Sequence, residues 1–159
     1  MLSKDFCYCS QAVHLVFMVA LQILEKNGTI PPLGNKLIKR LTFIGDATDV
    51  INGKYDGQEF FGRFNSGGNG VSVLWRKLDL GLCVNRFEDA IPGDMGKLFW
   101  NDYVGKYERG HVVVFQSYDK EAQTFCFWSC NSSQPPGYGQ HCIPVTNAHK
   151  FTFCRLQRP

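Results

Sequence analysis

The feature that most restricts the fold is an apolar stretch near the start of the chain, from Cys9 to about Lys26. When Cys9 is set at 0° and each residue adds about 100°, several apolar residues fall within roughly 60° of it, as in a buried helix. These residues are Ala12, Val13, Val16, Ala20, Ile23 and Leu24, and the opposite side carries Gln11, His14, Met18, Gln22 and Glu25. Asn27-Gly28 predicts the helix end, because glycine accepts the left-handed conformation common there. The pattern predicts a helix with Cys9 on its most buried face.

Cys9 opens this predicted helix, where unpaired backbone N–H groups and the positive end of the helix dipole favour the thiolate. The thiolate is the nucleophilic form of cysteine. The position equally suits a small core residue, because cysteine is among the most often buried residue types. Two interpretations therefore stay open, a nucleophile and a packing residue.

The chain has seven cysteines: Cys7, Cys9, Cys83, Cys126, Cys130, Cys142 and Cys154. This number indicates an oxidising compartment, and three disulfides would leave one thiol over. If Cys9 is that thiol, the other six can pair, and the connectivity stays open. Zinc is the alternative, with ligands Cys126, Cys130, His141 and Cys142, although their spacing does not match the common paired arrangements.

Length and charge narrow the class of protein. The 159 residues predict one domain, 1–159, and the net charge of +3 comes from basic residues spread along the chain, which argues against a nucleic-acid partner.

The apolar run from Ala12 to Leu24 is too short to span a bilayer. Asp5 precedes it and no small-residue cleavage site follows, so we interpret it as structure rather than a signal peptide. A secreted form would have lost its signal before residue 1. We expect a monomer without a membrane partner.

The first half of the chain is expected to be loop-rich. Two prolines make 30–35 a loop, and the region from Phe43 to Gly70 is punctuated by glycine pairs. The elements predicted here are a short helix at Lys36–Leu41, a strand at Glu59–Phe64 and a helix over Val71–Phe87.

The second half predicts an antiparallel sheet. After a turn at 87–94, the expected strands are His111–Phe115, Thr124–Cys130, Ile143–Val145 and Lys150–Leu156, with a long loop at Asn131–His141. The first two of these strands are expected to pair antiparallel. A helix followed by such a sheet is an α+β arrangement.

A nucleophilic thiol needs a base within hydrogen-bond reach, and the base needs a third group to hold its ring. His111, at the start of a predicted strand, can meet the first requirement if that strand faces the beginning of the helix. Cys7 is the second candidate nucleophile, on the polar side of the extended helix. His14, His141 and His149 are weaker candidates for the base.

Three motifs occur in order: Cys9-Ser10-x-Ala12-Val13, Ile91-Pro92-Gly93-Asp94 and Gly110-His111-Val112-Val113-Val114-Phe115. Together they resemble the NlpC/P60 papain-like peptidases. The aromatic segment ending at Cys130 and the Gly137-Tyr138-Gly139 loop resemble the amidase effectors of type VI secretion and their domesticated eukaryotic relatives. The chain departs from the family at Gln11, where the family has glycine, and residues 30–86 match no part of it.

The resemblance implies a papain-like fold, with an N-terminal catalytic helix packed on an antiparallel β-sheet. It also implies that Cys9 is the nucleophile and His111 the base. Strand alternation puts Ser129 and Asn131 on one face, so either is a candidate to orient the imidazole. Trp128 and Tyr138 are candidates to line a substrate groove, and equally for packing.

The implied activity is antibacterial hydrolysis of amide bonds in the stem peptides or cross-links of peptidoglycan, without a cofactor or metal. The setting would be extracellular or periplasmic, and a bacterial effector would have a cognate immunity protein. Two alternatives stay open. One is a disulfide-stapled secreted module that binds carbohydrate or cell wall through Trp128 and Tyr138, with Cys9 in a disulfide. The other is a papain-like acyltransferase acting on lipid.

Overall fold

Helix α1 (Cys9–Lys26) and six strands form the regular structure of the computed structural model, which describes residues 9–35, 38, 75, 79–101, 110–130 and 137–157. The strands are β1 (Gly81–Val84), β2 (Met95–Phe99), β3 (Gly110–Asp119), β4 (Thr124–Cys130), β5 (Tyr138–Pro144) and β6 (Lys150–Leu156). They form one sheet in the order β1-β6-β2-β3-β4-β5, and every pair is antiparallel. Short 3-10 helices, η2 (Phe87–Asp89) and η3 (Val145–Asn147), lie between strands. The predicted α+β class is confirmed.

Each face of the sheet carries its own hydrophobic cluster. Strand alternation sends Val112 of β3 toward α1, where the helix-side cluster also contains Cys9, Val13, Phe17 and Leu21. The opposite cluster is aromatic and consists of Phe87, Leu98, Val113, Phe115, Phe125, Phe127 and Phe153. Burying one such aromatic side chain contributes about 1.5–3 kcal/mol. The sheet is therefore a middle layer between α1 and a second apolar surface.

The prediction of α1 is confirmed in its position and bounds, and Cys9, Ala12 and Val13 are buried as expected, but the predicted buried face is wrong in part. Val16 and Ile23 were expected on the core side and are 40% and 53% exposed. His14 was expected on the polar side and is buried. The residues that pack on the sheet follow an i, i+4 row through Phe17, so the buried face is turned away from the direction of Cys9 by about 60°. Phe17, the bulkiest member of that row, packs on Trp75 with ring centroids 5.0 Å apart.

In the second half of the chain, the predicted strands at β4 and β6 are confirmed, as is the antiparallel pairing of β3 with β4. Three predictions are wrong. The expected loop at Asn131–His141 ends early, because β5 already begins at Tyr138 and pairs with β4, and Val145 opens η3 instead of ending a strand. The helix expected over Val71–Phe87 is replaced by β1 in its described second part, where pairing with β6 outweighs the helical spacing of the leucines.

Several predicted features lie outside the described residues. These are Cys7, the strand at Glu59–Phe64 and Asn131, together with most of the helix predicted at Lys36–Leu41. Within the described ranges, no helix is long and apolar enough to cross a membrane.

The turn that contains Pro92-Gly93-Asp94 is held by a buried carboxylate. Asp94 is 2% exposed, and its Oδ2 accepts hydrogen bonds from the backbone N–H of Ile91 at 2.9 Å and from Arg155 Nη2 at 2.9 Å. Its Oδ1 accepts from Arg155 Nε at 3.0 Å, and Arg155 Nη2 also donates to the carbonyl of Asp89 at 2.7 Å. These hydrogen bonds to Asp94 are the main reason why the pKa of Arg155 is raised. In this structure the motif therefore fastens the η2 turn to β6.

Candidate functional site

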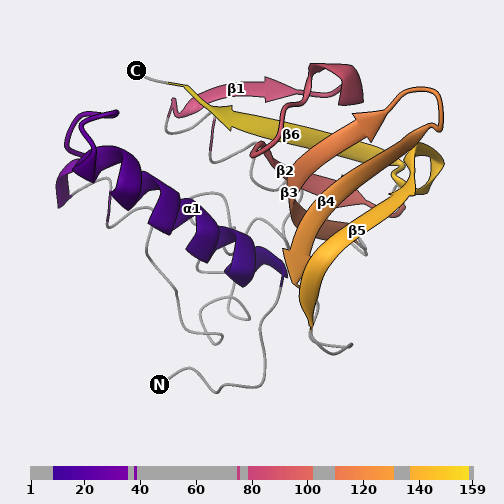
Figure 1. Ribbon diagram of the computed structural model, residues 1–159, viewed down its shortest axis with the longest axis horizontal. Coiled ribbons are helices and arrows are strands. Elements are labelled where there is room, and N and C mark those ends of the chain that lie inside the picture. Colours follow the sequence, from indigo (N-terminus) through magenta and orange to yellow (C-terminus); the bar gives the residue numbers. More distant parts are fainter. Residues whose placement is uncertain are drawn as a thin grey trace, which may run out of the picture.

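The predicted catalytic residues come from elements that meet at one end of the sheet. Figure 1 shows the first turn of α1 next to the end of β4, and the helix contacts both β3 and β4. Because β3 and β4 run antiparallel, the start of β3 lies beside the end of β4. Cys130 at the end of β4 pairs in turn with Tyr138 at the start of β5. The fold thus brings the segments that carry Cys9, His111, Ser129 and Tyr138 to a common end.

Cys9 lies inside the helix-side core. Its side chain is 8% exposed and belongs to the helix-side cluster, which also contains Val112. The partly buried Trp128 packs against the same cluster. Trp128 is therefore a packing residue in this arrangement, and the thiol of Cys9 has little contact with solvent.

His111 points to the other face of the sheet. It pairs with Leu98, a member of the aromatic cluster, whereas its neighbour Val112 faces α1. Its ring lies 6.4 Å from that of Trp100 and 6.0 Å from that of Phe127, in an edge-on arrangement with Phe127. The structure therefore brings the strand of His111 to the helix of Cys9, but it places the two side chains on opposite faces.

The environment of His111 keeps its imidazole neutral. Burial, together with the smaller effects of the nearby His141 and Lys97, lowers the pKa of His111 to about 4. Lys97 is itself fully buried, on the helix side of β2, with Nζ 5.2 Å from the ring centroid of Phe99. At neutral pH His111 can accept a proton, but it is a weak base in this setting.

This shifted pKa predicts a loss of stability in mild acid. Between pH 6.5 and about 4 the unfolded chain protonates at this position while folded His111 stays neutral. The contribution is therefore fully present above pH 6.5 and declines as the pH falls toward 4, by on the order of 3 kcal/mol. Urea unfolding across this range should show a smaller decline in His111→Gln. His141→Gln removes only a smaller contribution to the pKa shift and should keep most of the decline in stability. A decline in His111→Gln as large as in the wild type would contradict the assignment of this pH dependence to His111.

Ser129 projects from the same face as His111, as alternation along β4 from Phe127 requires. It is fully buried, and its Oγ donates a hydrogen bond to the carbonyl of Val112 at 2.8 Å. Ser129 therefore fastens β4 to β3 in this arrangement. The predicted alternative, Asn131, lies outside the described residues.

Two predicted loop residues occupy the exposed edge strand. Tyr138 is 61% exposed. His141 is exposed as well, and its ring lies 5.7 Å from the ring of Phe127, on the side away from His111. That His111 and His141 flank one aromatic ring was not expected from the sequence, because His141 was predicted to lie in a loop. Recognising that residues 138–144 form a strand paired with β4 would have placed His141 opposite Phe127.

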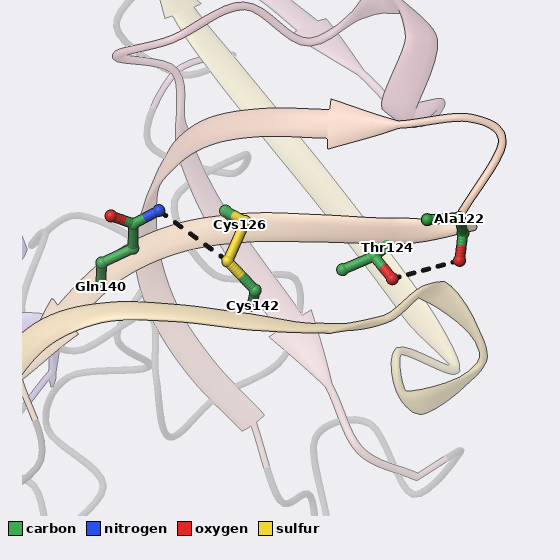
Figure 2. The surroundings of a disulfide bond; sticks show 5 residues. All are labelled: Ala122, Thr124, Cys126, Gln140 and Cys142. Atoms are coloured by element: carbon green, nitrogen blue, oxygen red, sulfur yellow. Dashed lines mark hydrogen bonds between the residues drawn. A yellow bond between two sulfur atoms is a disulfide. The ribbon is translucent and has the colours of Figure 1, made fainter.

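A disulfide staples β5 to β4. Cys126 and Cys142 are directly opposite in the two strands and are bonded, as Figure 2 shows, with Gln140 Nε2 3.8 Å from Cys142 Sγ. The expected use of disulfides is confirmed for this pair. The zinc alternative is wrong, because two of its four ligands are bonded to each other. Among the described residues no group of three or more His, Cys, Asp or Glu side chains could hold a metal ion.

The disulfide between Cys126 and Cys142 should contribute measurably to the free energy of unfolding. It closes a loop with a sequence separation of 16, for which restricting the unfolded chain is worth about 3 kcal/mol. Cys126→Ser combined with Cys142→Ser should therefore lower the free energy of unfolding in urea by about 2–3 kcal/mol. Reduction should destabilise the wild type to the same extent and leave the double variant unchanged. Equal stability of the wild type and the double variant would contradict a bonded pair.

Comparison of the chain with protein families, curated proteins and solved structures found no significant match. The fold and the described site define an α+β protein. The first turn of its helix α1 begins at a cysteine, and α1 packs on an antiparallel sheet.

Proposed function

We propose that this protein is a papain-like cysteine hydrolase that cuts amide bonds in peptidoglycan stem peptides or cross-links. The single observation that carries the proposal is the packing of the first turn of α1, opened by Cys9, on the adjoining strands that bear His111 and Ser129. A nucleophile on a helix and a base on the strand beneath it are the parts that such a mechanism needs. The resemblance of the three motifs to the NlpC/P60 peptidases supports the same reaction and substrate.

In this mechanism the Cys9 thiolate attacks the scissile carbonyl, and backbone N–H groups at the beginning of α1 stabilise the oxyanion. His111 accepts the proton of the Cys9 thiol and passes it to the amine, which departs as the thioester forms. Water then hydrolyses the thioester, which releases the acid and restores the Cys9 thiol. No cofactor takes part.

The mechanism requires His111 to reach the helix side of the sheet. A shift of one residue at the start of β3 would turn this side chain to the face of Cys9, because the faces alternate with every residue. In the described register Gly110 occupies the helix-side position, where the Leu98 carbonyl oxygen lies 2.6 Å and Lys97 Nζ 2.9 Å from the point a Cβ atom would take. Activity therefore also requires both the backbone at Leu98 and the Lys97 side chain to move. The described arrangement corresponds to a resting state in which the thiol is covered and the base is turned away.

The test is digestion of purified peptidoglycan, of both the lysine and the diaminopimelate type, with fragments identified by mass spectrometry. We expect amide cleavage that iodoacetamide abolishes. Absence of cleavage on both wall types, together with sedimentation of the protein with the walls, would contradict hydrolysis and support the binding module. Tyr138 on the stapled edge strand would then be its natural contact residue.

A further inference from the structure

A second pair of cysteines faces each other at the opposite edge of the sheet from the Cys126–Cys142 disulfide, between β1 and β6. Cys83 of β1 and Cys154 of β6 are directly opposite, and their Sγ atoms lie 3.2 Å apart. Directly opposite residues in antiparallel strands have Cα atoms about 4.5–5.5 Å apart, which is within the range that disulfides accept. Closing the bond requires the Sγ–Sγ distance to shorten to about 2.05 Å with a Cβ–Sγ–Sγ–Cβ dihedral near about ±90°.

The two thiols differ in their access to solvent. Cys154 is 1% exposed and lies in the helix-side cluster. Cys83 is partly exposed and lines a groove of about 570 Å³, whose described walls also include Asn85, Phe99, Lys150 and Thr152. A small reagent can therefore reach Cys83 from the groove, and Cys154 lies directly opposite Cys83 in β6.

We propose that Cys83 and Cys154 form a second disulfide by thiol–disulfide exchange with a small peptide disulfide such as oxidised glutathione. Cys83, as thiolate, attacks the glutathione disulfide, forms a mixed disulfide and releases one glutathione. Cys154, as thiolate, then attacks Cys83 Sγ and releases the second. The two protein thiols lose two electrons and two protons, and the glutathione disulfide gains them as two thiols.

The Cys83–Cys154 disulfide bonds β1, at the edge of the described sheet, covalently to β6. β1 has four residues, and β6 is its strand partner in the described sheet. The two cysteines are 71 positions apart, so the cross-link closes a long loop of the unfolded chain. Oxidation should therefore raise the Tm by about 10 °C. This inference does not depend on the proposed hydrolase activity.

The experiment exposes the folded protein to oxidised glutathione and maps the products by non-reducing peptide mass spectrometry. We expect a linked Cys83–Cys154 peptide and the accompanying rise in Tm. The Cys126–Cys142 disulfide, which is already formed in this structure, serves as the internal control that oxidised pairs survive the preparation. Absence of the linked peptide while that control pair is intact would overturn the proposal.

Single variants test the order of the two steps. Cys154→Val should trap one glutathione on Cys83, whereas Cys83→Val should carry none on Cys154, because Cys154 is covered. Circular dichroism establishes that each variant is folded, and valine keeps the buried volume close to that of the thiol. Equal uptake by the two variants, or an equal rise in Tm in wild type and Cys83→Val, would overturn it as well.

Discussion

Replacing Cys9 by alanine should abolish peptidoglycan cleavage while the fold persists. Loss of a covalent nucleophile removes the whole acylation route, so we expect the rate to fall at least about a thousandfold. The substitution exchanges a small buried side chain for a slightly smaller one inside the helix-side cluster, so its cost in stability should be about 1 kcal/mol. The measurement is the release of stem-peptide fragments, quantified by mass spectrometry, with circular dichroism as the check on folding.

The matched control for Cys9→Ala is Cys130→Ala. Cys130 is equally buried, at the end of β4 close to the first turn of α1, and has no catalytic role in the mechanism. Its alanine variant should cleave within a few-fold of the wild type. Cleavage that survives in Cys9→Ala would contradict the nucleophile assignment and direct attention to Cys7. Equal loss in both variants would show that a disturbed core, rather than a missing thiol, stops the reaction.

The largest expected effect on stability is at Asp94. Asp94→Asn keeps the size of the side chain but removes the charge that two nitrogens of Arg155 contact, and Arg155 is then left partly buried without its charged partner. Breaking a buried pair from one side costs about 3–5 kcal/mol. Because the side chain of Arg155 is 25% exposed, we expect about 3 kcal/mol here and a fall in Tm of about 6–10 °C.

Asp89→Asn is the matched control, because it alters a carboxylate of the same turn. Its side chain is 52% exposed and lies 3.9 Å from Arg86 Nε, a surface contact worth little. It should change the free energy of unfolding by less than about 0.5 kcal/mol. Urea unfolding followed by fluorescence measures both variants. A similar small effect in Asp94→Asn would contradict a structural role for this carboxylate.

The parts of the fold that were predictable are those with a strong local pattern. α1 combines an apolar period with a glycine that takes φ = 66° at position 28, and β4 and β6 alternate residues with high strand propensity. β2 was not predictable, because all five of its residues are buried and include a glycine and a lysine. Gly96 fits there because a Cβ atom would collide with the ring of Phe153, a requirement that only the paired strand reveals.

The candidate site was predictable only to the level of its elements. The motifs identify the helix of Cys9 and the strand of His111, and these two elements do meet. The direction of His111 depends on which residues of β3 share a face with α1, and pairing with β2 decides this. The partner of Cys126 likewise follows from the register of β4 with β5, in which Cys142 lies directly opposite. Both are long-range properties that spacing along the chain does not contain.

The most direct test of the central claim, that Cys9 is a catalytic nucleophile, is labelling with a stem-peptide chloromethyl ketone. This reagent has the shape of the substrate and alkylates an activated thiol. We expect the fraction of protein labelled at Cys9, determined by peptide mapping, to equal the fraction of peptidoglycan-cleaving activity lost. Loss of activity with the label on another residue, or full activity with Cys9 labelled, would contradict it.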